Sequence, residues 1–197
     1  MSIPAPAELT CWSHLDQAAK RERLLQAAGE VFARDGLDAP MPAVAAAAGA
    51  GIGSVYRQFP SKQDLLAALV VQRLRETEAG ADAALADSRV EGSSEGAWAA
   101  LTGLLWRLAE RQAADDVLGE AMATLSEHPA VQRELANAVQ ALERLLAAAR
   151  AEGQLRTDAT GLDLRLLFAA TRAAAALEPQ AWRRMLELGI DALAAQP

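Results

Sequence analysis

Residues 49–62 read GAGIGSVYRQFPSK and interrupt a chain that is otherwise rich in alanine and leucine. The stretch holds three glycines and the only tyrosine of the protein. On its N-terminal side, residues 42–48 predict a short helix that ends at Gly49, and residues 52–58 predict a second one. Ala45 is small enough for the second helix to cross closely over it, and Gly49 permits the positive φ of a tight turn. The spacing predicts a helix-turn-helix in which the second helix projects outward.

The predicted second helix carries small and polar residues that suit a DNA groove. Its glycines allow a close approach to the duplex, Ile52 can meet a thymine methyl group, and Arg57 can donate to base edges or phosphates. A phenol and an ammonium beside the helix, from Tyr56 and Lys62, can hold phosphates and set the register. The candidate DNA-contacting residues are Pro42, Gly51, Ile52, Gly53, Ser54, Tyr56, Arg57, Gln58 and Lys62.

Charge is distributed unevenly along the chain. The net charge of -7 argues, taken alone, against nucleic acid. Residues 20–62, however, carry six basic residues against four acidic ones, and both lysines of the protein lie there. A mildly basic N-terminal segment in an otherwise acidic chain indicates DNA contact at one end only.

The composition favours helices throughout, because alanine, leucine, glutamate and arginine lose little entropy in a helix. No segment alternates with the period of a strand. We predict an all-α fold of about nine helices, with Ser61 and Asp64 forming a capping box before the fourth. The helices are expected near 16–35, 42–48, 52–58, 62–86, 94–113, 115–127, 130–152, 160–176 and 179–195.

Two stretches, RERLLQAAGEVFARDG and VAAAAGAGIGSVYRQFPSKQDLL, together resemble the DNA-binding domain of the TetR family of bacterial transcriptional regulators. The resemblance covers roughly residues 20–68, and the rest of the chain is similar in architecture only. It is carried by Ala28, Phe32, Gly36, Ala45, Ala48, Gly49, Gly53, Tyr56, Phe59, Lys62 and Leu65. The resemblance implies a homodimer that binds a palindromic operator, usually as a repressor released by a small ligand.

This architecture implies three segments: a flexible arm at 1–15, a three-helix helix-turn-helix DNA-binding domain at 16–66, and a helical-bundle domain for ligand sensing and dimerisation at 67–197. We expect residues 160–195 to pair with their copies in a four-helix interface, because these segments supply many leucines and small alanines. The expected interface residues are Leu162, Leu166, Leu167, Met185, Leu186, Leu188, Ile190 and Leu193.

The resemblance also implies an effector pocket among the middle helices. An apolar stripe such as Trp98, Leu101 and Leu105 is more often plain core, and Arg172 fits either an acidic ligand group or an interface. If these residues line a pocket, it suits an apolar or aromatic molecule. The candidate ligand-binding residues are Trp98, Leu101, Leu105, Trp106, Met122, His128, Phe168 and Arg172.

Enzyme chemistry has little support in the sequence. His14 and His128 are the only histidines, no nucleophile with its base is identifiable, and metal-ligand spacings such as HExxH are absent. The lone Cys11 excludes an internal disulfide and a cysteine-based metal site. We predict no catalysis, no cofactor and no metal. We also expect a cytoplasmic protein without a membrane partner, because neither a signal peptide nor a long apolar run is present.

Two other interpretations stay open. In the first, the chain is a helical ligand- or partner-binding protein whose helix-turn-helix has lost DNA affinity. The acidic charge favours it, as do Gln58, where the family commonly has a phosphate-contacting histidine, and Pro42, where it often has a polar residue. In the second, the protein binds DNA but senses nothing, and its middle domain is packed solid.

Overall fold

The computed structural model describes residues 12–89, 96–114 and 116–195. Within these residues the chain forms nine α-helices and one short 3-10 helix, Trp12–His14, with no β-strand, which confirms the all-α prediction. None of these helices combines the length and the apolar character needed to cross a membrane. The chain divides into two compact units, Met1–Leu69 and Val70–Pro197.

The first unit contains α1 (Gln17–Asp35), α2 (Met41–Ala48), α3 (Ile52–Gln58) and the first turns of α4 (Lys62–Ser88). The carboxylate of Asp16 caps α1 by accepting a hydrogen bond from the Ala19 N–H at 2.8 Å. Apolar residues from all four helices, and from Phe59 directly after α3, fill one core. The short helices gain stability from this packing. The most buried of the larger side chains are Leu24, Val31, Phe32, Val44, Val55, Phe59 and Leu65.

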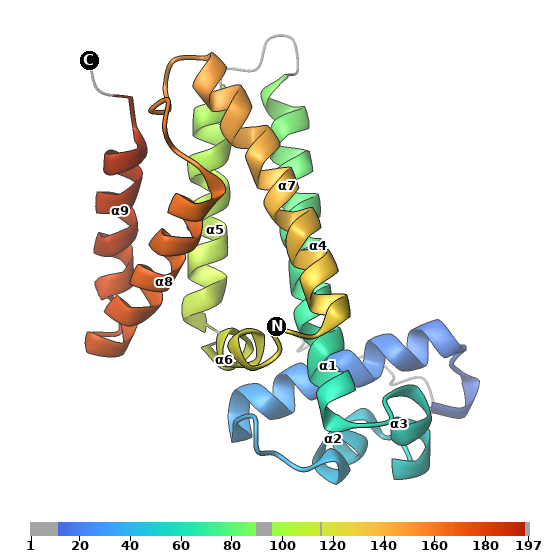
Figure 1. The fold of residues 1–197 in the computed structure, drawn as a ribbon. Helices are drawn as coiled ribbons and strands as arrows, with labels where there is room; N and C mark the ends of the chain where they lie inside the picture. Colours follow the sequence, from blue (N-terminus) through green and yellow to red (C-terminus); the bar gives the residue numbers. More distant parts are fainter. Residues whose placement is uncertain (1–11, 90–95, 115, 196–197) are drawn as a thin grey trace, which may run out of the picture. The chain divides into compact units, whose positions relative to one another are not determined.

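The second unit contains the rest of α4 with α5 (Ala97–Ala114), α6 (Asp116–Thr124), α7 (Pro129–Ala151), α8 (Gly161–Leu177) and α9 (Ala181–Leu193). Figure 1 shows α8 and α9 running side by side in opposite directions, and α5 packs against α7, α8 and α9. The core of this unit is built largely of leucine and alanine. The helices begin and end close to the predicted positions. Of the arm expected at 1–15, residues 1–11 lie outside the described residues, as do the predicted helical residues 94, 95 and 115. Residues 12–14 of that segment form the 3-10 helix.

Capping boxes hold the starts of α4 and α8. The predicted box before α4 is confirmed, because Ser61 N–H donates to Asp64 Oδ2 at 2.9 Å and Asp64 N–H donates to Ser61 Oγ at 3.1 Å. An equivalent box before α8, formed by Thr160 and Asp163, was not predicted. Its hydrogen bonds from Thr160 to the carboxylate lower the pKa of Asp163, which keeps the cap ionised.

The N-termini of α5 and α8 in the second unit each receive a carboxylate from a distant residue. Glu152, at the end of α7, accepts hydrogen bonds from the N–H groups of Ala97 and Trp98 at 2.8 and 3.3 Å. Glu143, within α7, accepts one from the Gly161 N–H at 2.6 Å. These contacts join α7 to the first turns of α5 and α8, and they satisfy donors that the helices leave unpaired.

Glu152→Ala is expected to lower the free energy of unfolding by about 1–2 kcal/mol, because it leaves two N–H groups at the start of α5 without their acceptor. Urea denaturation followed by circular dichroism measures this change. The matched control is Glu127→Ala, which removes an exposed carboxylate in the turn after α6. Equal stability of the two variants would contradict the capping role of Glu152.

Candidate nucleic-acid interface and sensor cavities

The turn between α2 and α3 has the geometry that the sequence predicts. Gly49 ends α2 in the left-handed region with φ 66° and ψ 29°, and its neighbour Ala50 donates its N–H to the Ala45 carbonyl at 2.9 Å. Val44, Ala48 and Val55 are completely buried between the two helices. The helix-turn-helix is therefore present, and α3 is its second helix.

One side of α3 is open to solvent. Ile52 and Tyr56 are 41% and 46% exposed, which is unusual for large apolar side chains. Gly51 is the N-cap and Gly53 lies in the first turn; both have negative φ, and a Cβ at either position would meet nothing within 4 Å. Within the chain, therefore, neither the backbone conformation nor the packing requires glycine at these two positions.

The polar candidates on α3 are held in place by neighbouring side chains. Arg57 donates from Nη2 to Ser54 Oγ at 3.1 Å, and both residues belong to the predicted DNA-contacting set. Gln58 donates from Nε2 to Gln17 Oε1 at 2.6 Å, so its amide is oriented by α1. Lys62 is half-buried, with its Nζ 5.8 Å from the centroid of the Phe32 ring. Pro42 is exposed in the first turn of α2.

Sequence reasoning missed Arg21, an exposed residue of α1 beside this surface. Its guanidinium lies 4.5 Å from the centroid of the Phe59 ring, and Phe59 follows α3 directly. Gln17, which contacts Gln58, was missed as well. Both contacts join residues about 40 positions apart, and no local pattern in the sequence signals such pairs.

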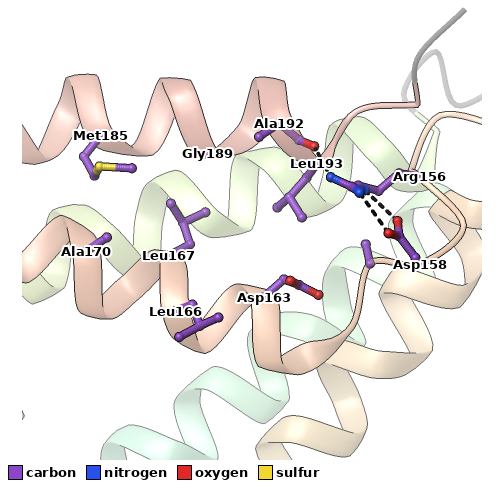
Figure 2. A pocket seen from close by; sticks show the side chains of 11 residues that line it. Arg156, Asp158, Asp163, Leu166, Leu167, Ala170, Met185, Gly189, Ala192 and Leu193 are labelled. Atoms are coloured by element: carbon purple, nitrogen blue, oxygen red, sulfur yellow. Dashed lines mark hydrogen bonds and ion pairs between the residues drawn. The ribbon is translucent and has the colours of Figure 1, made fainter.

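A cavity of about 330 Å³ lies between α8 and α9 in the second unit (Figure 2). Its apolar floor includes Leu167, whose side chain occupies the space that a Cβ at Gly189 would need. At one end, Arg156 donates to both carboxylate oxygens of Asp158 at 2.6 and 2.8 Å and to the Ala192 carbonyl at 3.3 Å. The hydrogen bond and the charge of Arg156 lower the pKa of Asp158. The remaining lining residues are Ala159, Asp163, Leu166, Ala170, Met185 and Leu193.

A second cavity of about 200 Å³ lies among α5, α8, the turn after α8 and α9. Gln112 and Thr171 supply polar groups to it, Arg172 supplies a cation, and Trp182 forms part of the wall. The Trp182 ring makes an edge contact with the Trp106 ring, with centroids 6.1 Å apart. Small residues complete the lining: Ala109, Ala113, Ala175, Ala176 and Pro179.

The predicted ligand-binding residues are not brought together in one cavity. Arg172 lines the smaller one, and the backbone carbonyl of Phe168 accepts hydrogen bonds from two groups beside it. Leu101 and Leu105 are instead fully buried core residues, with Trp98 and Trp106 packed against the same core. They line neither cavity, because their face of α5 is filled by other helices. Met122 and His128 are half-buried and lie apart from both lining sets.

The predicted dimer residues divide by burial. Leu162, Leu166 and Leu188 are exposed, and Met185 and Ile190 are half-buried. Leu167, Leu186 and Leu193 are core residues of the unit, and Leu167 and Leu193 also line the larger cavity. Only Leu186 is fully buried within the unit, which corrects its assignment to an intermolecular surface. The physical reason is that α8 and α9 carry apolar residues on two sides. One of these sides already packs within the chain, where α8 and α9 contact each other and α5.

A well-packed helix-turn-helix with an exposed second helix, followed in the chain by a helical unit with cavities, is typical of one-component DNA-binding regulators. A family model described as "Bacterial regulatory proteins, tetR family" matches residues 24–69. The chain belongs to the TetR family of bacterial transcriptional regulators, and it is accordingly a DNA-binding transcriptional regulator.

Solved structures support this assignment along nearly the whole chain. The TetR transcription regulatory protein from Mycobacterium vanbaalenii is 30% identical, with a TM-score of 0.66 over 90% of this chain and 96% of that chain. A protein whose structure gives the molecular basis for control of antibiotic production by a bacterial hormone is 31% identical, with a TM-score of 0.64 over 91% and 100% of the two chains.

A third structure is similar in fold alone. SmeT, the repressor of the Stenotrophomonas maltophilia multidrug efflux pump SmeDEF, is 22% identical, with a TM-score of 0.63 over 94% of this chain and 93% of that chain. SmeT has also been solved in complex with triclosan. A comparison with curated protein sequences gives no match.

Proposed function

We propose that this protein is a homodimeric repressor that binds a palindromic operator through α3 and is released by a small apolar or aromatic effector. The observation that carries the proposal is the open surface of α3. Gly51 and Gly53 are not required by the chain's own packing, and they stand beside an exposed isoleucine and tyrosine. Glycine where nothing inside the protein needs it suits a close approach of an outside surface, here the DNA backbone and groove.

The electrostatic contacts around α3 support the same proposal. Arg57, Lys62 and Arg21 place cationic groups on and beside the helix. Such groups position a protein on phosphates, whereas Ile52 and Ser54 are suited to base edges. The hydrogen bond from Gln58 to Gln17 joins the C-terminal end of α3 to α1.

An exposed apolar face supports the homodimer. On α8, Leu162, Leu166 and Leu177 are exposed on one side of the helix, and Leu188 is exposed on α9. Leu166 also lines the larger cavity, so this exposed leucine borders a hollow between α8 and α9 (Figure 2). An isologous interface needs such self-complementarity, because each copy offers the same patch. Two copies would present two α3 helices to the half-sites of a palindrome.

An effector is supported by the smaller cavity and by the relatives. The cavity has a mostly apolar lining with a few polar groups, which is typical of small-molecule sites. A relative 31% identical is concerned with a bacterial hormone, and SmeT binds triclosan. Release of DNA requires that the effector bind one conformation more tightly than the other, typically by about 1–3 kcal/mol of coupling.

Lys62→Ala tests the DNA-binding surface by its salt dependence. Loss of one phosphate contact is expected to weaken binding to all sequences by a similar factor and to lower the slope of log affinity against log salt by about one unit. Fluorescence anisotropy on the DNA upstream of the protein's own gene, at several salt concentrations, measures both effects. Arg34→Ala is the control, because it removes an exposed cation that is paired with Asp35 at the other end of α1.

An unchanged salt slope for Lys62→Ala would remove Lys62 from the interface. If the unaltered protein selects no duplex from a random DNA pool, the result would support the alternative function, a helical ligand- or partner-binding protein without DNA affinity. The observation that favours this alternative is the Gln58–Gln17 hydrogen bond, because it engages the Gln58 amide within the chain.

A further inference from the structure

The first two turns of α1 lie against the C-terminal end of α3. Gln17, the first residue of α1, accepts a hydrogen bond from Gln58 Nε2 at 2.6 Å. Arg21 follows one turn later, and its guanidinium lies 4.5 Å from the centroid of the Phe59 ring. Residues four positions apart share one face of a helix. One face of α1 therefore contacts two consecutive residues at the end of α3.

Arg21 keeps its charge unpaired within the described part of the chain. Arginines elsewhere pair with nearby carboxylates, as Arg34 does with Asp35. Arg21, in contrast, forms no ion pair with the residues that the structure describes. It is exposed and lies over the ring of Phe59, which is itself 1% exposed. An aromatic ring orients a guanidinium without cancelling its charge, so the N–H groups can still bind an anion.

The two glutamines keep hydrogen-bond donors beyond their mutual contact. Gln58 uses one of its two N–H groups on Gln17 Oε1. Its second N–H group has no acceptor among the described residues, and the same holds for the amide nitrogen of Gln17. The neighbouring carboxylate of Asp16 accepts the Ala19 N–H at 2.8 Å and is thus engaged by α1 itself. The end of α3 is therefore bordered by N–H donors and a cation.

This combination of groups suits an anion with several acceptor oxygens. A phosphodiester of the DNA backbone is such an anion, and arginine and glutamine side chains commonly contact it. The position in the fold points to the same partner, because the exposed Tyr56 and Arg57 immediately precede Gln58 on α3. Contacts of this kind fix the orientation of a protein on the duplex without reading its sequence.

We propose that α1 supplies a second contact to the DNA backbone, in which Arg21 and Gln58 donate to phosphate oxygens. Gln17 is a positioning residue in this contact, because it binds one N–H group of Gln58 and so directs the other. The proposal rests on the docking of α3 proposed above, since the two helices must lie on the duplex together. The Gln58–Gln17 hydrogen bond then serves DNA binding and does not compete with it.

Arg21→Met removes the charge and keeps an apolar side chain over Phe59. It is expected to weaken binding to every duplex by about tenfold and to lower the slope of log affinity against log salt by about one unit. Fluorescence anisotropy measures both effects on the DNA upstream of the protein's own gene and on a scrambled version of it. Arg34→Met is the matched control, because Arg34 lies at the other end of α1 and is paired with Asp35.

A double-mutant cycle on the same two duplexes tests the positioning role of Gln17. Gln17→Met and Gln58→Met each remove the hydrogen bond between the two side chains, and each is expected to weaken binding by about three- to fivefold. The double variant is expected to bind no more weakly than Gln58→Met alone, because Gln17 acts only through Gln58. Gln26→Met is the matched control on α1, since Gln26 contacts Glu30 instead.

Thermal unfolding of each free variant separates DNA contact from stability. Arg21→Met, Gln17→Met and Gln58→Met are expected to unfold within about 3 °C of the unaltered protein, because the contacts that they remove lie at the surface. Weaker DNA binding that is accompanied by a larger drop in melting temperature, with an unchanged salt slope, would assign these residues to the fold and overturn the proposal.

Two further outcomes would overturn parts of the proposal. An unchanged salt slope for Arg21→Met would remove the backbone contact of α1. Additive losses from Gln17→Met and Gln58→Met would remove the positioning role, since residues that act independently add. Equal affinity of the unaltered protein for both duplexes contradicts the operator of the proposed function, and the salt slopes still decide the contact of α1. No binding to either duplex at about 50 mM salt would overturn both.

Discussion

Gly53→Glu is expected to lower the affinity for the operator by about 100-fold while leaving the free protein as stable as before. A Cβ at Gly53 meets nothing within 4 Å, and the residue has helical φ. Glutamate is a better helix former than glycine and is favoured in the first turn of a helix. On the DNA, however, the same side chain brings bulk and a negative charge against the phosphates. Losing even one or two good contacts costs about 1–3 kcal/mol each.

The measurement pairs thermal unfolding of the free protein with fluorescence anisotropy on the operator. Gly29→Glu is the matched control, since a Cβ at Gly29 also has no neighbour within 4 Å, but the residue lies on α1 outside the predicted surface. If Gly53→Glu lost stability along with affinity, the glycine would serve the fold and not the interface. If it kept full affinity, α3 would not enter the groove.

The helix-turn-helix could be predicted because its signals are local. Gly49 must have positive φ, Ala45 must be small four residues earlier, and Ser61 and Asp64 reciprocally cap the next helix. Each rule involves residues within one or two turns of each other. Such rules predict the elements of the first unit and most helix boundaries of the second. The family resemblance could be recognised in the first unit because its signals are local.

The second unit was less predictable, because its decisive contacts join residues that are distant in sequence. Glu152 caps α5 from 55 residues away, and Gln112 meets Thr171 from 59 residues away. The family resemblance implied a pocket along the apolar stripe on α5, although such a stripe is more often core, and Leu101 and Leu105 do pack into the core. Periodicity shows that a helix has an apolar face, but it does not say which neighbour covers that face. Leu186 was placed at the dimer surface for the same reason and is buried instead.

Leu166→Asp is expected to separate the proposed homodimer, raising its dissociation constant by at least about 100-fold. Leu166 is 59% exposed on the apolar side of α8 and borders the larger cavity. Burying a leucine contributes about 1.5–3 kcal/mol, and a two-fold interface contains the residue twice, so the loss is doubled. The aspartate adds the cost of placing two carboxylates in an apolar surface. Operator affinity should fall with the dimer, because half-site binding loses its second α3.

Two variants separate the interface from the fold. Ala147→Asp adds the same charge at an exposed position of α7 and is expected to leave the dimer intact. Leu186→Ala is expected to lower the free energy of unfolding by about 2–5 kcal/mol, because Leu186 is 0% exposed within its own unit. Light scattering after size exclusion measures the mass of each. A Leu166→Asp protein that keeps the mass of two copies would contradict the α8–α9 interface. Dissociation that also appears in Ala147→Asp would mean that added charge, and not the loss of Leu166, drives the copies apart.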